Sequence, residues 1–235
     1  MISLDKLSNS NLQLLDQMGF VHLEDILLSE SLLELHRELS LVFDQMKQTS
    51  FSTTQQLFWQ RVPSQQIETL RLPSIENLFG EQEAFLSIKS SITKVIRDVF
   101  DPDMDLRSVH AFFKPAKNGG ETPWHQDPAY GDISIVHDNI TCWIPLQDIL
   151  SELESCLEFL PGSHLGKELR RHDPLAKGRL SALVADITND EFSNRATIPC
   201  KLGDIILHRS YVIHRGTPNR SDKDRIAVVF IYGKP

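Results

Sequence analysis

Trp124-His125-Gln126-Asp127-Pro128 is the stretch from which both the fold and the chemistry of this chain can be inferred. In a β-strand, residues i and i+2 project to the same face, so His125 and Asp127 can direct an imidazole and a carboxylate to one point. Two such groups make an incomplete metal site. A second histidine would complete the two-histidine, one-carboxylate triad of redox-active non-haem iron. His214 is a candidate for that histidine, and Arg225 follows it by 11 residues.

The composition limits the class of protein. At 235 residues the chain is long enough for one sizeable core, so we expect a single domain over residues 1–235. A charged fraction of 24% and a hydrophobic fraction of 40% argue against intrinsic disorder. The net charge of −8 disfavours nucleic acid and anionic membranes as partners, because both attract clustered Lys and Arg.

The cysteines and the N-terminus indicate a compartment. Cys142, Cys156 and Cys200 are odd in number and lack a CxxC spacing, which predicts reduced thiols rather than a disulfide framework. The first residues lack the basic region and apolar run of a signal peptide. No stretch approaches the roughly 18 consecutive apolar residues of a membrane span. We therefore expect a cytoplasmic protein.

Helical periodicity dominates the first hundred residues. Residues 12–18 predict a short helix and residues 20–23 a strand. Apolar residues recur at helical spacing from Ser29 to about Lys47, and again over residues 85–99. The segment 48–66 is rich in Ser, Thr and Gln without a clear period, which is typical of a loop.

After Leu106 the pattern changes to short β-rich runs separated by Gly, Pro, Asn and Asp. The predicted strands are residues 108–113, 122–126, 139–146, 156–159, 204–208, 211–214 and 225–232. They predict a mainly β fold with flanking helices, namely a double-stranded β-helix or cupin-like jelly roll. In this prediction the helices of residues 8–100 pack on a jelly-roll core of residues 106–235. Residues 165–200 form a polar insertion between strands.

Arg225 begins the last predicted strand. Alternation places Arg225, Ala227 and Val229 on one face of that strand. A cation at the start of an otherwise apolar, half-buried strand needs an anionic partner, because an unpaired buried charge is costly. A guanidinium suits a carboxylate, since the two can form parallel charge-assisted hydrogen bonds.

Several motifs together resemble a known family. They are Phe113-Lys114-Pro115, Trp124-His125-Gln126-Asp127, Pro161-Gly162-Ser163-His164, Gly203-Asp204 and the run from His214 to Ser221, followed by Arg225. In these motifs the chain resembles the phytanoyl-CoA dioxygenase family of Fe(II)- and 2-oxoglutarate-dependent oxygenases. The opening Gly19-Phe20-Val21, followed by a leucine-rich helix, is also similar to the start of that family. The resemblance therefore covers most of the chain.

The resemblance implies a cofactor, two cosubstrates and a set of site residues. It implies Fe(II) bound by His125, Asp127 and His214, with 2-oxoglutarate and O2 as cosubstrates. Arg225 matches the arginine that binds the distal carboxylate of 2-oxoglutarate, and Trp143 matches an aromatic residue beside that cosubstrate. The expected reaction is hydroxylation of an aliphatic C–H of a metabolite or natural-product intermediate, with release of succinate and CO2. Related halogenases lack the carboxylate that Asp127 supplies, so halogenation is not expected.

Further residues could reach the same pocket. His110 lies on the strand that leads to the Phe113-Lys114-Pro115 motif and could line the pocket. Arg61, Arg71 and Lys114 are candidate additional contacts to an anion, and the sequence does not choose among them.

His208 competes with His214 as the second histidine, because it lies six residues earlier in the same region. The family's spacing to Arg225 favours His214. The chain departs from the family at Glu154-Ser155, where an Asn-Gly pair is usual. That turn shapes the rim of the site, so the departure affects the inference of substrate more than that of metal.

Two other functions are compatible with the same fold. A cupin-like metal protein could use the barrel for isomerisation, hydrolysis or ligand binding without 2-oxoglutarate, although such a site needs no second anion contact of the kind Arg225 offers. A catalytically silent relative could act as a binding module, although the complete triad argues against it. Fold analogy alone does not decide among these functions.

Overall fold

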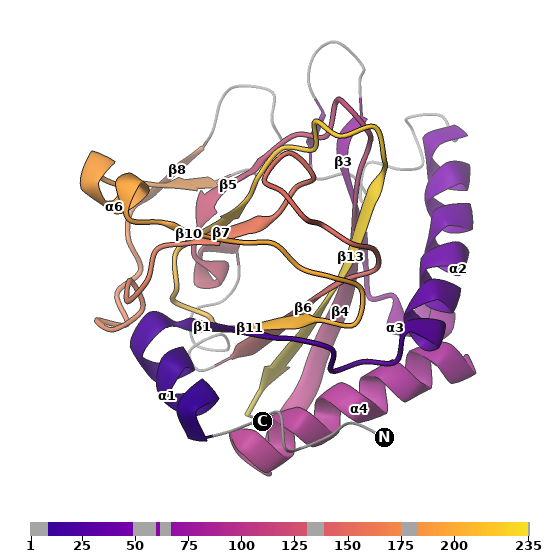
Figure 1. Cartoon of the computed structure of the whole chain (residues 1–235), viewed down its shortest axis with the longest axis horizontal. Helices are drawn as coiled ribbons and strands as arrows, with labels where there is room; N and C mark the ends of the chain where they lie inside the picture. Colours follow the sequence, from indigo (N-terminus) through magenta and orange to yellow (C-terminus); the bar gives the residue numbers. More distant parts are fainter. Residues whose placement is uncertain (1–8, 49–59, 62–66, 131–138, 175–182, 235) are drawn as a thin grey trace.

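Two antiparallel β-sheets face each other in the part of the chain that a computed structural model describes (Figure 1), which is residues 9–48, 60–61, 67–130, 139–174 and 183–234. The larger sheet has the order β1 (Phe20–Leu23), β11 (Ile205–Arg209), β6 (Ile140–Pro145), β13 (Arg225–Gly233), β4 (Asp105–Lys114), β3 (Ile67–Pro73) and β2 (Gln60–Arg61). The smaller sheet has the order β10 (Ala196–Ile198), β7 (Leu157–Phe159), β12 (His214–Gly216) and β5 (Thr122–His125). β8 (His172–Pro174) and β9 (Leu183–Ala185) form a separate pair.

This arrangement is the double-stranded β-helix that the sequence predicts. The helices are α1 (Asn9–Met18), α2 (Ser29–Gln48), α3 (Glu76–Phe79), α4 (Glu83–Val99), the 3-10 turn η2 (Asp127–Tyr130) and α6 (Asn189–Ser193). Figure 1 shows α2 and α4 along the outer side of the sheet that contains β4 and β13. Between the sheets, the rings of Phe20 and Phe159 stack with centroids 4.3 Å apart. None of the helices in the described ranges combines the length and the hydrophobicity that crossing a lipid bilayer requires.

The structure differs from the predicted elements in three places. Tyr211 and Val212 lie in a turn, and the strand predicted at residues 211–214 begins only at His214. β3 was not predicted, and it extends the larger sheet beside β4. The insertion 165–200 contains β8, β9, α6 and β10, and β10 completes the smaller sheet by pairing with β7. Of the predicted loop 48–66, the structure describes only Gln48, which ends α2, and the two residues of β2. The rest of that segment lies outside the described residues.

The main core lies between the larger sheet and its helices. In α2 the buried residues include Leu32, Leu35, Leu39 and Phe43, which recur at the spacing of one helix face. They pack in one cluster with the outward-facing residues of β13, such as Val228 and Phe230. The opposite face of the same strands is thereby left to line the space between the two sheets.

Two leucines of α2 test this packing. Leu35 is 1% exposed, whereas Leu33 is 55% exposed. Leu35→Ala should lower the free energy of unfolding by about 2–5 kcal/mol, because it leaves a cavity in the core. Leu33→Ala should change it by less than about 0.5 kcal/mol. Urea unfolding of both variants measures the difference, and equal losses would contradict the packing of α2 on the sheet.

Candidate metal centre

Strand register places the predicted pocket residues on the inner face of the larger sheet. Directly opposed residues of an antiparallel pair share a face. Val229 of β13 lies opposite His110 of β4 and opposite Trp143 of β6. Arg225 precedes Val229 by four residues on the same strand, so it projects to the same face. All four side chains therefore belong to the inner face, as the alternation predicts for Arg225.

The smaller sheet contributes the two histidines of the predicted triad. His214 of β12 lies opposite His125 of β5, and their ring centroids are 4.2 Å apart. Asp127 Oδ1 lies 3.6 Å from the Nε2 atom of each histidine. The three donor atoms lie within 4.8 Å of one another. The structure therefore brings His125, Asp127 and His214 together as a group that could bind a metal ion.

Backbone hydrogen bonds set the orientation of both imidazoles. His125 Nδ1 donates to the carbonyl oxygen of Pro123 at 2.7 Å. His214 Nδ1 donates to the carbonyl oxygen of Val212 at 3.1 Å. Because a carbonyl can only accept, each Nδ1 bears the proton, and in the neutral ring Nε2 keeps its lone pair. Both lone pairs face the Asp127 carboxylate, as metal ligation requires.

Burial favours the protonation state that a metal needs. It lowers the pKa of His125 to about 3, with a further lowering by His214. It lowers the pKa of His214 to about 4. Burial alone would raise the pKa of Asp127, but the nearby histidines and a hydroxyl hydrogen bond bring it below its ordinary value. At neutral pH the site thus presents two neutral imidazoles and one carboxylate, which is the ligand-competent form.

Thr141 binds the second carboxylate oxygen of Asp127, and no motif in the sequence marks this threonine. Its Oγ1 atom donates to Asp127 Oδ2 at 2.9 Å. Thr141 is buried on β6, opposite His208 of β11 and Ile231 of β13. Because Oδ2 is engaged, Oδ1 is the oxygen turned toward the two histidines.

His208, the competing ligand, lies beside the triad but outside it. Its ring centroid is 4.5 Å from that of His214. It projects from β11 of the larger sheet, whereas His214 projects from β12 of the smaller one. Burial lowers the pKa of His208 as well, so it is neutral at physiological pH. The geometry supports the choice of His214.

A second polar group surrounds Arg225. The guanidinium Nη2 donates to Ser155 Oγ at 2.9 Å, and its Cζ lies 6.0 Å from the Trp143 ring centroid. Nε and Nη1 are buried and have no hydrogen-bond partner among the described residues. Lys114 is also buried, and its Nζ donates to the carbonyl oxygens of Gly216 and Thr217 at 3.2 and 2.9 Å. Burial lowers the pKa of Arg225 to about 10, and burial together with Arg225 lowers the pKa of Lys114 well below its usual range.

A third group lies nearer to Asp127. Arg71 Nη2 is 3.1 Å from His110 Nε2, and Ser108 Oγ lies at the same distance from that nitrogen. Burial lowers the pKa of His110 to about 4, with a further lowering by Arg71. Arg71 and His110 both interact electrostatically with Asp127. Of the three candidate cations, Arg71 and Lys114 therefore reach the interior, whereas the side chain of Arg61 lies outside the described residues.

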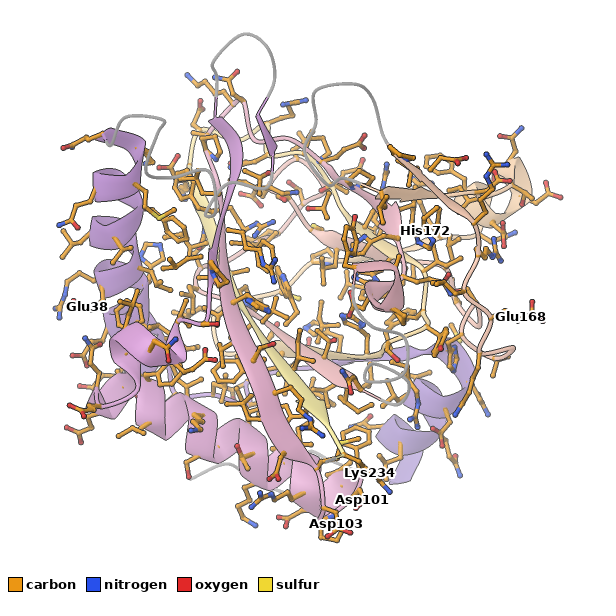
Figure 2. The ribbon with its side chains drawn as sticks, turned by 180° about the vertical axis from the view of Figure 1, so that it is seen from behind. Glu38, Asp101, Asp103, Glu168, His172 and Lys234 are labelled. Atoms are coloured by element: carbon orange, nitrogen blue, oxygen red, sulfur yellow. The ribbon has the colours of Figure 1, made fainter. Side chains whose placement is uncertain are left out.

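Gln126 links the metal-binding strand to the insertion. It is fully buried, and its Nε2 donates to the carbonyl oxygens of Glu168 and Tyr211. Its Oε1 accepts from the Arg170 backbone N–H, and its own N–H donates to His172 Nε2 at 3.1 Å. Figure 2 shows Glu168 and His172 on one side of the molecule, away from the Lys234–Asp101 ion pair at its other end. Gln126, which lies between His125 and Asp127 in the sequence, thus anchors the first residues of the insertion through hydrogen bonds.

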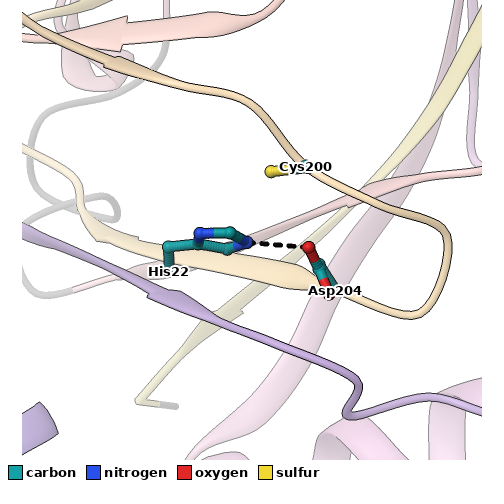
Figure 3. A group of neighbouring side chains, drawn as sticks. All are labelled: His22, Cys200 and Asp204. Carbon is teal, nitrogen blue, oxygen red and sulfur yellow. Dashed lines mark hydrogen bonds and ion pairs between the residues drawn. The ribbon is translucent and has the colours of Figure 1, made fainter. Parts of the chain in front are cut away.

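A second cluster, of His22, Cys200 and Asp204, also brings potential ligand atoms within 4.8 Å of one another (Figure 3). His22 Nε2 lies 2.9 Å from Asp204 Oδ2. That carboxylate also accepts from the backbone N–H groups of Asp25 and Lys201. Burial raises the pKa of the Cys200 thiol, which keeps it protonated. The Asp204 carboxylate is therefore already hydrogen-bonded on both oxygens. We interpret this cluster as a structural contact that joins the segments around Asp25 and Lys201, and not as a metal site.

Comparisons with known proteins agree with this geometry. The sequence model of a family described as phytanoyl-CoA dioxygenase matches residues 15–227. A curated relative, the phytanoyl-CoA dioxygenase domain-containing protein 1 homolog of Caenorhabditis briggsae, is 26% identical over 148 residues, which cover 60% of this chain and 51% of the relative. The chain thus spans about half the length of the first curated relatives it matches.

Solved structures share the fold. EvdO2 from Micromonospora carbonacea var. aurantiaca, complexed with 2-oxoglutarate, superposes with a TM-score of 0.73 at 20% identity, covering 100% of this chain and 94% of that one. The epimerase SnoN, in complex with Fe3+, alpha ketoglutarate and nogalamycin RO, gives a TM-score of 0.70 at 17% identity, covering 96% and 82% of the two chains. At these identities the likeness establishes the double-stranded β-helix fold.

Replacing each of the two neighbouring histidines tests the ligand assignment. His214→Ala should abolish tight Fe(II) binding, because it removes one of three donors. His208→Ala should retain binding within a fewfold, because His208 lies outside the triad. Anaerobic Fe(II) titration followed by metal analysis compares the two. If the His208 variant loses iron and the His214 variant keeps it, the assignment is wrong.

Thr141 provides a finer test of the carboxylate. Thr141→Val keeps the shape of the side chain but removes the hydroxyl that binds Asp127 Oδ2. We expect Fe(II) affinity to fall about 10- to 100-fold, the usual effect of losing a group that orients a metal ligand. Thr141→Ser should keep most of the affinity. Equal affinity in all three proteins would show that Asp127 needs no such support.

Proposed function

The chain belongs to the phytanoyl-CoA dioxygenase family, and on that premise we propose that it is a mononuclear non-haem iron oxygenase that uses 2-oxoglutarate and O2. One observation carries the proposal: the interior contains a triad in its ligand-competent form and, separately, a buried arginine whose Nε and Nη1 have no partner among the described residues. The first fits a metal and the second fits an anion.

The triad fits Fe(II) by donor type. Two imidazole nitrogens and one carboxylate oxygen form the set that non-haem iron oxygenases use, with positions left for other ligands. His125 and His214 are 8% and 6% exposed, so protein covers most of both rings. The side chain of Asp127 is 25% exposed, which leaves the site accessible on that side.

Arg225 fits the distal carboxylate of 2-oxoglutarate. Among the described residues, the Ser155 hydroxyl is the only group that accepts a hydrogen bond from its guanidinium, and an incoming carboxylate would offset the cost of burying that charge. Trp143 lies beside the guanidinium and would cover one side of the cosubstrate. EvdO2 and SnoN, which share the fold, were solved with this 2-oxo acid. A cupin-like metal protein without 2-oxoglutarate would leave Arg225 without a role.

The chain's own residues would position the reactants. When bound, Fe(II) and 2-oxoglutarate supply the oxidising chemistry, in which O2 and the 2-oxo acid give succinate and CO2 while one oxygen atom enters the substrate. His125, Asp127 and His214 would hold the metal, and Thr141 would keep Asp127 in one orientation. Apolar side chains of the inner face, such as Phe159 and Ile206, would exclude water from the space between the two sheets.

We propose hydroxylation of an aliphatic C–H of a small-molecule metabolite or natural-product intermediate as the reaction. The presence of Asp127 favours this over halogenation, which requires that position to be open. The fold alone allows other outcomes, because SnoN is an epimerase and SnoK, another structural neighbour, is a carbocyclase. We also propose that residues 1–235 act as one domain, because β1 and β3 of the N-terminal half pair within the larger sheet.

A spectroscopic titration tests the proposed cosubstrate. Under anaerobic conditions the Fe(II) protein should develop a visible charge-transfer band when 2-oxoglutarate is added. Arg225→Gln should keep iron and raise the Kd for 2-oxoglutarate about 30-fold or more, since removing one partner of a buried charge pair costs about 2 kcal/mol or more. Arg209→Gln removes an arginine that pairs with Asp16 near the surface, and it serves as the control. An unchanged Kd in the Arg225 variant would refute its role, and the absence of a band would favour a cupin-like function.

A further inference from the structure

Ser155 has an unusual backbone for a buried residue. Its φ is +69°, in the left-handed region that glycine adopts without strain and other residues adopt at a cost. Five non-glycine residues in the described ranges have positive φ, and Ser155 alone among them is buried, at 0% exposure. It lies in the buried segment that leads into β7 (Leu157–Phe159). A strained position that glycine would relieve calls for a functional reason.

The Ser155 hydroxyl has two partners that fix its direction. It donates its one proton to the carbonyl oxygen of Thr217 at 2.6 Å. Its oxygen is therefore left to accept from Arg225 Nη2, at 2.9 Å. The same Thr217 carbonyl accepts from Lys114 Nζ at 2.9 Å. A continuous buried hydrogen-bond path thus joins Lys114 to Arg225 through one hydroxyl and one carbonyl.

This path determines how Arg225 can meet an anion. Ser155 uses one of the two Nη2 hydrogens, so the other remains available beside an unpartnered nitrogen of the same guanidinium. A carboxylate can bind two such N–H groups in parallel only if the guanidinium plane is already oriented. Glycine at position 155 would remove the hydrogen bond between Arg225 Nη2 and the Ser155 hydroxyl, which orients that plane. Alanine would do the same while keeping the backbone strain.

We propose that Ser155 is a positioning residue for the distal carboxylate of the 2-oxo acid, acting through Arg225. Holding serine in the left-handed region costs free energy that glycine would not cost. In return, the serine supplies a hydroxyl at this position. Ser155 thereby tunes selectivity for a dicarboxylic 2-oxo acid over a monocarboxylic one. This inference rests on the proposed function, because it assumes that Arg225 binds the cosubstrate.

Two variants separate the hydroxyl from the strain. Ser155→Gly removes both, and Ser155→Ala removes only the hydroxyl. Each is titrated anaerobically as the Fe(II) protein with 2-oxoglutarate and, separately, with pyruvate, which has the 2-oxo acid group but no distal carboxylate. The visible charge-transfer band reports both titrations, and thermal unfolding reports stability.

We expect both variants to bind 2-oxoglutarate about tenfold more weakly, the effect of losing one hydrogen bond to a charged group. Their Kd for pyruvate should stay within twofold of the wild-type value. Ser155→Gly should unfold at a temperature equal to or above that of the wild type, and Ser155→Ala below that of Ser155→Gly. Weaker cosubstrate binding in a protein that is no less stable would exclude a merely structural role.

Other outcomes overturn the inference. Wild-type affinity for 2-oxoglutarate in Ser155→Gly would show that the hydroxyl does not position Arg225. Equal weakening for 2-oxoglutarate and pyruvate would indicate a general disturbance of the pocket. If the wild-type Fe(II) protein develops a band with neither acid, the proposed function fails and the role of Ser155 fails with it. A band in the wild type with unchanged selectivity in the variants removes the role of Ser155 alone.

Discussion

The pairing of β12 with β5, which sets His214 opposite His125, is the constraint on which the rest of the site depends. A shift of one residue along either strand would turn an imidazole to the opposite face of the sheet. Charges on the outer face oppose such a shift. Glu158 of β7 is fully buried there, and it accepts hydrogen bonds from Arg215 of β12 and from Arg195. These ion pairs hold β12 against β7, and Arg215 Nη1 also lies 3.6 Å from Glu121, which precedes β5, so charges on the outer face support the pairing of β12 with both neighbouring strands.

The larger sheet serves two environments. Its outer face packs on α2 and α4 and is apolar throughout the main core, whereas its inner face contributes Thr141, Arg225 and His110 to the site. Because the core on one face is closely packed, the strands resist the small displacements that would misplace polar groups on the other. Lys114 and Arg225 are both buried on this side of the sheet, and the carbonyl and hydroxyl oxygens that accept their hydrogen bonds offset part of the cost of burying them.

Strand alternation predicts that His125 and Asp127 share a face, and the short β-rich runs predict the jelly roll, whereas the choice of His214 and the role of Arg225 come from the family's motifs. The contacts of Thr141 with Asp127 and of Ser155 with Arg225 were not predicted, although the turn that contains Ser155 was expected to shape the rim. Each of the two is an ordinary polar residue in its own segment, and its importance appears only when Asp127 or Arg225, distant in the sequence, is placed against it. The turn at Tyr211 and Val212 was mistaken for strand because both residues are buried, and burial gives a turn the same apolar sequence as a β-strand.

β3 shows the converse error. Arg71 was a candidate contact to an anion, but no strand was predicted around it, and the pairing of β3 with β4 places its side chain beside His110. Sequence alternation reports whether neighbours differ in polarity, but it does not distinguish a polar face toward water from a polar face toward an active site.

Gln126 has a consequence for how this protein can change over time. Within the described part of the chain, the hydrogen-bond partners of its side chain are all main-chain atoms, namely the carbonyl oxygens of Glu168 and Tyr211 and the N–H of Arg170. Every amino acid except proline offers the same backbone groups, so these bonds do not depend on which side chains positions 168 and 170 carry, whereas the bond from the Gln126 N–H to His172 Nε2 does. Mutations there can therefore reshape the rim of the barrel while the strand bearing the metal ligands stays in place. Substitutions in the insertion could in this way change which molecules fit the site without displacing the metal-binding residues.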